Sequence, residues 1–363
     1  MNHLVKITGL ITIVTVLPAA VLITPGPDPY KPVYPSYFGN RIELPEDNPL
    51  TVQGIRLGRM LFYETALSAN GKIACATCHR QELAFTDGKQ FSAGVDGSLQ
   101  PRNTMALVNL LWVRHFFWDG RTRGLEQQAD TPLTNVHEMG QPLAVSASRL
   151  TALHRYTKLF NAAFGSDDIT GDRIVKALAQ FERTLISANS KYDQFLRGEY
   201  QPTSSEANGI KLFFNNPDPV KGIRGASCSH CHDGPKTFAE LYHNNGLDSI
   251  HKDPGREKIT GLDIDRGRFR VVTLRNIALT APYMHDGRFR TLEEVVDHYN
   301  EHILPSATLS PFLQHNSNTR GGENLDLTAQ EKKDLIAFLH LLTDSSFITD
   351  PRFSNPFNTT DHE

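Results

Sequence analysis

Two short segments decide how this 363-residue sequence is interpreted: Cys-Ala-Thr-Cys-His at residues 75–79 and Cys-Ser-His-Cys-His at residues 228–232. Together they contain all four cysteines of the chain. A thiol–disulfide redox motif would need neither a second copy nor a histidine after it. A zinc site made from both cysteine pairs would join two distant parts of the chain and would leave the shared trailing histidine unexplained.

The pattern Cys-x-x-Cys-His is the attachment signature of c-type haem. The two thiols bond to the porphyrin, and the adjacent histidine gives its ring nitrogen to the iron. Two copies, with no cysteine left over, predict two covalently bound haem c groups. The expected attachment residues and proximal ligands are Cys75, Cys78, His79, Cys228, Cys231 and His232.

The two segments belong to a longer internal repeat. Asn109, Trp-Asp-Gly-Arg at 118–121 and Leu-Glu at 125–126 recur, at one constant offset, as Asn276, His-Asp-Gly-Arg at 285–288 and Leu-Glu at 292–293. Chance could supply one such match but hardly all of them in the same register. The repeat therefore predicts two related domains, each with one haem.

Helical signals dominate the rest of the chain. Apolar residues at 174, 177, 178, 181 and 185 follow the spacing of an amphipathic helix. Thr203, Thr291 and Thr328 are each followed three residues later by glutamate, which is the capping-box pattern of a helix start. We expect a mainly α fold of two tandem cytochrome c-like helical domains, each enclosing one covalently bound haem, with long loops.

The N-terminus indicates where the protein is located, and the net charge argues against one class of ligand. Lys6 is the only Lys, Arg, Asp or Glu among the first 27 residues, and an apolar stretch at 7–23 follows it, as in an export signal or an uncleaved anchor. The stretch is slightly short for a membrane-spanning helix. A formal net charge of −3, with no long run of Lys or Arg, argues against nucleic-acid binding.

These motifs resemble the bacterial di-haem cytochrome c peroxidases and their relative MauG, over about residues 40 to 350. Besides the two haem segments, the resemblance lies in Phe-Trp-Asp-Gly-Arg at 117–121, Glu-Met-Gly at 138–140, Leu-Arg-Asn at 274–276 and Ala-Pro-Tyr at 281–283. In that family one haem cleaves peroxide and the other receives electrons.

The resemblance implies roles for individual residues. His79 would ligate the peroxidatic haem and His232 the electron-transfer haem. Glu138 matches the distal acid–base carboxylate, Gln128 its neighbour and Pro132 a wall of the same pocket, while Trp118 matches the tryptophan between the haems. The residues that match the ligands of an inter-haem calcium ion are Asn103, Thr280 and Pro282.

The implied domain division follows the two haem segments. It consists of a signal peptide or membrane anchor at 1–24, a Pro-rich linker at 25–40, an N-terminal peroxidatic haem domain at 41–190, a C-terminal electron-transfer haem domain at 191–350 and a polar tail at 351–363.

Two positions depart from the common family pattern. Many of these peroxidases block the peroxidatic iron with a distal histidine, eight residues before the calcium asparagine, until the other haem is reduced; here that residue is Val95. We therefore expect an open first haem that needs no reductive activation. The usual methionine ligand of the second haem is replaced by Tyr299, as in MauG, and it shares the inward helix face with Leu292. His302 is the next candidate, and Met284 and His285 follow.

The leading functional hypothesis is a cytochrome-c peroxidase type oxidoreductase that reduces hydrogen peroxide to water with electrons from a small donor protein, a cytochrome c or a cupredoxin. The first alternative is MauG-like oxidation of a partner protein through high-valent haems. The second is a pure electron carrier, in which Glu138 has no role. An exported, periplasmic protein is expected, and a membrane tether and a homodimer both stay open.

Overall fold

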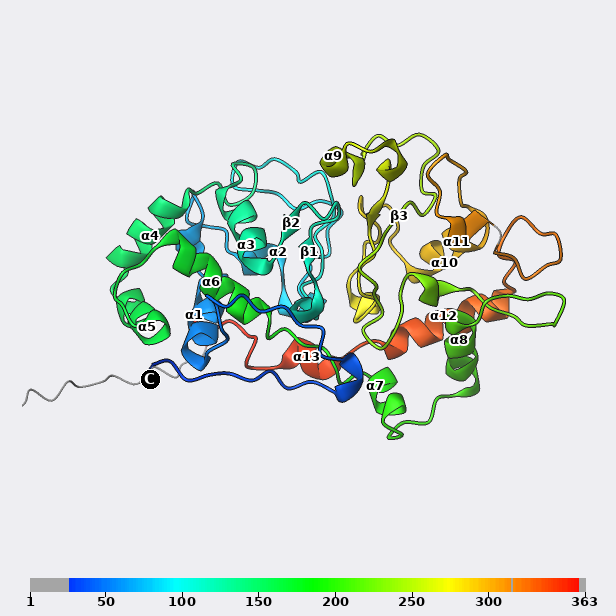
Figure 1. The fold of residues 1–363 in the computed structure, drawn as a ribbon, viewed down its shortest axis with the longest axis horizontal. Helices are drawn as coiled ribbons and strands as arrows, with labels where there is room; N and C mark the ends of the chain where they lie inside the picture. The colour runs from blue at the N-terminus through cyan, green and yellow to red at the C-terminus, as the bar shows by residue number, and fades with distance from the viewer. Residues whose placement is uncertain (1–25, 315, 359–363) are drawn as a thin grey trace, which may run out of the picture.

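The computed structural model describes residues 26–314 and 316–358. The predicted signal or anchor at 1–24 lies outside these residues, as does most of the C-terminal half of the polar tail. The described chain is mainly helical, and its elements fall into two halves that lie side by side in Figure 1. Among the described residues, no helix has the length and apolar character that crossing a membrane requires.

The first half runs from the N-terminal segment to α6. Its longer elements surround a short helix that contains the first cysteine pair. The elements are the 3₁₀ turns η1 (Ser36–Phe38), η2 (Thr65–Leu67), η3 (Gln81–Leu83) and η4 (Leu110–Trp112), the strands β1 (His115–Phe116) and β2 (Thr122–Arg123), and the helices α1 (Val52–Phe62), α2 (Cys75–Cys78), α3 (Leu125–Thr134), α4 (Leu143–Ala152), α5 (Arg155–Phe164) and α6 (Gly171–Glu182).

The second half is likewise built of helices, 3₁₀ turns and two strands of two residues each. It consists of α7 (Lys191–Leu196), α8 (Ser204–Phe214), η5 (Cys228–His230), β3 (Tyr242–His243), α9 (Glu257–Thr260), η6 (Asp263–Asp265), β4 (Phe269–Arg270), η7 (Ile277–Leu279), α10 (Leu292–Glu301), α11 (Pro311–Gln314), α12 (Ala329–Leu341) and α13 (Ser345–Thr349). Each half has one antiparallel pair of strands, β1 with β2 and β3 with β4.

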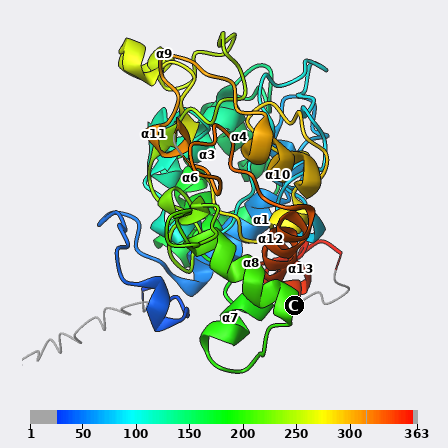
Figure 2. The same ribbon diagram turned by 90° about the vertical axis from the view of Figure 1, so that its right-hand side faces the viewer.

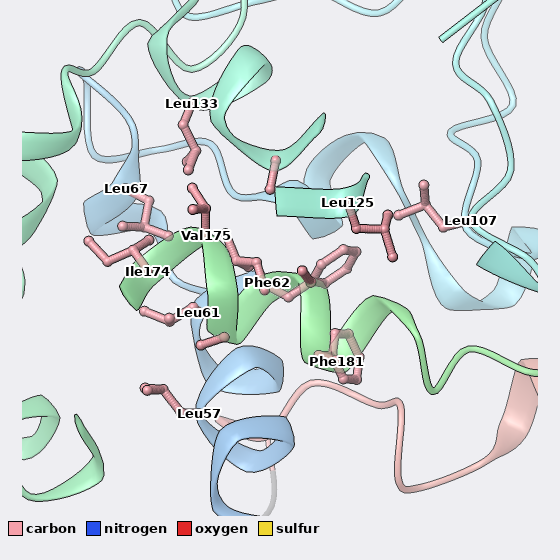
Figure 3. Close-up of a cluster of buried hydrophobic side chains, with 14 of the residues drawn as sticks. Leu57, Leu61, Phe62, Leu67, Leu107, Leu125, Leu133, Ile174, Val175 and Phe181 are labelled. Atoms are coloured by element: carbon pink, nitrogen blue, oxygen red, sulfur yellow. The ribbon is translucent and has the colours of Figure 1, made fainter. Parts of the chain in front are cut away.

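The core of the first half forms where α1 and α6 cross. Leu57, Leu61 and Phe181 are fully buried there, and Figure 3 shows their side chains converging between the two helices. Gly58 makes the close approach possible, because a Cβ on it would come within 1.9 Å of the Ala177 carbonyl oxygen. A glycine at a helix crossing lets the two backbones touch, which brings more side chains into van der Waals contact.

The core of the second half repeats this arrangement with α8 and α12, which lie against one another in Figure 2. Gly209 occupies the crossing, where a Cβ would lie 1.9 Å from the Asp334 carbonyl oxygen. Phe338 is completely buried beside it and makes an edge-on contact with Phe213, with ring centroids 4.9 Å apart. A glycine at a helix crossing therefore allows close helix packing in the core of each half.

The internal repeat is also visible in the backbone. Asn109 and Asn276 are both left-handed, with φ of 57° and 62°, and each begins a 3₁₀ turn. Both side chains reach Ser187, between the halves: Asn109 Nδ2 donates to the Ser187 carbonyl at 3.1 Å and Asn276 Nδ2 donates to its hydroxyl at 3.0 Å. The two repeat units thus meet at one serine.

The local helix signals are confirmed. The periodic segment forms α6, and all three expected capping boxes are present, at the N-termini of α8, α10 and α12. In each, the threonine hydroxyl accepts from the glutamate N–H and the glutamate side chain accepts from the threonine N–H. Two otherwise unpaired donors are thereby satisfied at each helix start.

The end of the chain returns to the first half. Phe347 in α13 and Phe353 after it join the core built around α1 and α6, and the Phe347 ring lies 5.5 Å from that of Phe85. Tyr63 donates a hydrogen bond to the Phe353 carbonyl at 2.7 Å. The last buried residues of the protein therefore complete the core of the domain formed by the first residues, and α13 lies near the lower centre of Figure 1.

Candidate haem and peroxide site

The first cysteine segment is held in a geometry suited to metal ligation. Its cysteines form no disulfide, and burial raises the pKa of both Cys75 and Cys78. His79 Nδ1 lies 2.8 Å from the Phe85 carbonyl oxygen. This contact fixes the ring as the Nδ1–H tautomer, so Nε2 is the nitrogen left for iron. Burial also lowers the pKa of His79, which favours the neutral form that a metal needs.

The second cysteine segment has the same arrangement. Cys228 and Cys231 are unpaired, and burial raises their pKa values to about 12 and about 11. His232 Nδ1 lies 3.0 Å from the Val272 carbonyl oxygen, and burial lowers the pKa of this ring to about 4. His232 Nε2 is therefore the free coordinating nitrogen of a neutral imidazole.

A cavity of about 750 Å³ adjoins the second segment. Its size lies within the range of about 300–1,000 Å³ that is usual for ligand pockets. Cys228, Cys231 and His232 line it together with apolar side chains of α10 and α12, and residues of the first half, Met105 and Trp118 among them, close its far side. Unpaired thiols, a neutral imidazole and an apolar wall fit a covalently attached haem.

Near the first segment, the structure brings the proposed distal residues together. The Val95 N–H donates to the Glu138 carbonyl at 2.8 Å, and the Met139 N–H donates to the Pro132 carbonyl at 3.0 Å. Gln128 lies one turn before Pro132 on α3, and its buried Oε1 has no hydrogen-bond partner. Val95, from a distant part of the sequence, and Pro132 therefore both contact the segment that contains Glu138 and Met139.

The environment of Glu138 suits proton transfer. Its side chain is partly buried, and burial raises its pKa, against the opposing effects of the Asn135 amide and the Arg121 guanidinium. Asn135 Nδ2 donates to Glu138 Oε1 at 2.9 Å, which leaves Oε2 available. Burial is the main cause that raises the pKa of Cys78, and the charge of Glu138 adds to it, so the carboxylate is close enough to act on the first segment electrostatically.

Trp118 lies at the contact between the halves. Its Nε1–H donates to the Asn103 carbonyl at 2.8 Å, and its ring meets that of His285 edge-on, with centroids 6.5 Å apart. His285 in turn stacks on Phe269 at 3.7 Å. Because Trp118 and His285 occupy equivalent positions in the repeat, the two halves contact one another through matching residues.

The inward face of α10 carries Tyr299 into the cavity, along with Leu292, Val295 and Val296. Burial raises the pKa of Tyr299 to about 12. Met284 and His285 also line the cavity, whereas His302, just after α10, is exposed and does not. His302 is therefore the least well placed of the candidates, and two of the others, Tyr299 and Met284, share a neighbour.

Asn245 joins these two candidates and was not identified from the sequence. Its Nδ2 lies 3.2 Å from Tyr299 Oη and 3.4 Å from Met284 Sδ. His298 fixes the backbone of Asn245, with Nε2 at 3.0 Å from the carbonyl oxygen, and is itself buried rather than exposed. A lone asparagine in a loop carries no sequence signal that could have revealed this role.

The proposed calcium residues all adjoin the same cavity. Asn103, Thr280 and Pro282 all line the cavity between the halves. Asn103 Nδ2 donates to the Lys89 carbonyl at 2.9 Å, which leaves its amide oxygen available as a ligand. Backbone and amide oxygens are ligands that calcium accepts.

Two pseudo-symmetric helical halves, each with a Cys-x-x-Cys-His segment, define the class of cytochrome c-like haem proteins. Known proteins make the assignment specific. A model of the di-haem cytochrome c peroxidase family matches residues 52–201. The methylamine utilization protein MauG of Methylophilus methylotrophus is 34% identical, over 83% of this chain and 85% of its own length.

Two further relatives agree. The cytochrome c551 peroxidase of Nitrosomonas europaea is 37% identical, over 66% of this chain and 71% of its own. The solved structure of a MauG-like protein associated with microbial copper homeostasis has a TM-score of 0.81 and 37% identity, and covers 90% of this chain and 99% of its own. This chain belongs to the di-haem cytochrome c peroxidase/MauG family, which implies two haem c groups and a peroxidase-type oxidoreductase.

Proposed function

We propose that this protein carries one haem c on each cysteine segment and reduces hydrogen peroxide to water at the first, with electrons that enter at the second from a small cytochrome c or cupredoxin. The observation that carries the proposal is the placement of Glu138, a partly buried carboxyl with a raised pKa and one unpaired oxygen, beside Val95. Reduction of one peroxide consumes two electrons and two protons and gives two waters.

The work of the protein at this site is proton transfer. The bound haem supplies the iron and the electrons that break the O–O bond. Glu138 Oε2 accepts the proton of the peroxide oxygen nearer the iron and returns it to the departing oxygen. Acid–base help of this kind typically contributes about 10²–10⁴ in rate. Asn135 holds the other carboxylate oxygen and thereby sets the direction of Oε2, while Gln128 offers its unpaired Oε1 to peroxide or water.

Valine has no atom that can ligate iron, so Val95 would leave a haem on the first segment open in its oxidised resting state. His232 and Tyr299 would be the residues that hold the iron of the second haem. Trp118 would give electrons an aromatic route between the two halves. Calcium at Asn103, Thr280 and Pro282 would hold the two halves in register. The N-terminal apolar segment directs export to the periplasm.

Steady-state assay of the di-haem protein with peroxide and reduced cytochrome c tests this function. We expect turnover without prior reduction, and a fall of about 100-fold or more in Glu138→Gln at unchanged haem content. Glu293→Gln, which changes an exposed carboxylate of α10 outside the cavity, is the matched control and should keep full activity. Equal activity in Glu138→Gln and the parent protein would contradict the role of Glu138.

A second candidate function is the oxidation of a partner protein with the oxidising equivalents of peroxide, as the similarity to MauG suggests. The specific observation in its favour is Tyr299 on the cavity wall, in place of the usual methionine. Negligible turnover with small donors, together with a long-lived spectral change after peroxide addition, would favour this function over the peroxidase. Rapid turnover would exclude it as the main activity.

A further inference from the structure

Arg270 is a buried cation without an anionic partner. Its side chain is 9% exposed and lines the cavity beside the second cysteine segment. Its Nε has no hydrogen-bond partner. Its Nη2 makes a weak contact with Met105 Sδ, at 4.0 Å. Tyr242 and Glu240 attract it only at longer range.

Other buried arginines of the described chain are paired. Arg275 contacts Asp193, and Arg183 makes a bidentate pair with Glu126 at 2.6 and 2.9 Å. A buried charge normally has a partner of opposite sign, because its removal from water is otherwise uncompensated. Arg270 is the exception, and it faces a cavity rather than packed protein.

Backbone hydrogen bonds fix the position of Arg270. The Arg270 N–H donates to the Trp118 carbonyl at 2.7 Å, and Arg270 pairs with Tyr242 across the β3–β4 ladder. Two residues later, the Val272 carbonyl accepts from His232. One short segment thus connects Trp118, the unpaired cation and the proximal histidine, so Arg270 lies at the edge of the second haem pocket that faces the first half.

We infer that the Arg270 guanidinium binds a propionate carboxylate of the second haem and so orients that haem towards Trp118. The inference rests on the proposed function in one respect, the presence of a haem on the second cysteine segment. A carboxylate fits because arginine binds it in a bidentate manner, with two parallel N–H···O bonds. The haem carries two such groups, and the protein supplies no carboxylate of its own at this point.

The test compares the di-haem parent protein with Arg270→Leu, Arg270→Lys and the control Arg290→Leu, which removes an exposed cation. Haem content is counted first, and both reduction potentials are then measured without peroxide. In Arg270→Leu the propionate charge loses its partner, which favours the oxidised iron. We expect the equilibrium constant for reduction of the second haem to fall about tenfold, about 59 mV for one electron. Arg270→Lys keeps the positive charge, so the reduction potential of its second haem should stay close to that of the parent protein.

Unchanged potentials in fully loaded Arg270→Leu would overturn the inference. If that variant does not load, an experimental structure of the parent protein decides: a guanidinium–propionate hydrogen bond supports it, and a guanidinium without a carboxylate neighbour refutes it. A potential that shifts with added phosphate or acetate would assign the site to a solvent anion instead. If the parent protein shows no peroxide turnover, the proposed function is contradicted. The inference that Arg270 binds a haem propionate is not, because its test measures potentials without peroxide.

Discussion

The two halves share a frame and differ in the residues proposed for each haem site. Each half crosses two helices at a glycine, Gly58 or Gly209, and each begins a 3₁₀ turn at a left-handed asparagine. In the first half, the proposed distal residues are a valine and a partly buried carboxyl. In the second, they are a tyrosine and a methionine that contact one amide. The packing of the repeat is therefore alike in the two halves, whereas the residues of the proposed sites are not.

Val95→His should erase this difference most strongly, because it supplies the first haem with a distal ligand. If histidine binding to iron is favoured by about 2.7 kcal/mol, only about 1% of the oxidised protein stays open, and the initial peroxide rate falls about 100-fold. Stopped-flow mixing of the oxidised protein with peroxide measures this, and the resting spectrum should lose its high-spin component. Val220→His, at an exposed position outside the cavity, is the control; a high-spin resting spectrum in Val95→His would contradict the open-pocket assignment.

Tyr299→Met should change the other half. Thioether ligation raises haem potentials, and axial ligands span about 0.8 V across haem proteins, so we expect a rise on the order of 0.1 V in the second haem alone. Spectroelectrochemical titration of the two haems measures it. Tyr299→Phe separates ligand loss from ligand exchange, since the aromatic ring is kept. If both variants leave the potential unchanged, Tyr299 only packs against the haem.

The shared frame predicts matched effects at the two crossings. Gly58→Ala and Gly209→Ala each force a Cβ to within 1.9 Å of a carbonyl oxygen on the facing helix, at Ala177 and at Asp334. Overpacking of this kind costs about 1–3 kcal/mol of unfolding free energy. Thermal or denaturant unfolding of the loaded proteins measures it. The controls are Arg56→Ala and Lys211→Ala, which change exposed residues of α1 and α8. If only one of the two glycine variants lost stability, the two crossings would not be equivalent.

The smallest expected effect is a pH dependence that belongs to the first half. Glu138 must be ionised to accept the peroxide proton, so the rate falls as pH drops through its pKa. Burial raises that pKa above the ordinary value of 4.5, and the midpoint of the acid limb therefore lies above 4.5. The pH profile of kcat/KM shows it. In Asn135→Leu the loss of the amide donor should raise the pKa of Glu138 further, so the midpoint of the acid limb should move to higher pH. A midpoint at or below pH 4.5 in the parent protein would contradict the burial argument.

Local patterns predicted the elements of this fold well because they act over one or two helical turns. The capping threonines at 203, 291 and 328 and the periodic face of α6 determine helix starts and orientation by themselves. The offset between the repeats predicted the matched positions of Trp118 and His285. Tyr299 was assigned to the inward face by helix geometry alone.

What the sequence did not reveal depends on contacts between distant segments. Asn245 and Arg270 lie in irregular or two-residue segments, where no periodicity marks a functional side chain. His298 does not line the cavity and is buried against Asn245. The residue assignments at the haems stay predictions that the experiments above test, and the calcium ligands and the domain boundaries stay predictions as well.

The return of the chain end has a consequence for biosynthesis. Phe347 and Phe353 belong to the same core as Leu57 and Phe181, although almost the whole second half is translated between them. At about 5–20 residues per second, the ribosome needs roughly 10–30 s to supply these last side chains after α6 has been made. Until these side chains arrive, the core of the first half lacks part of its apolar packing.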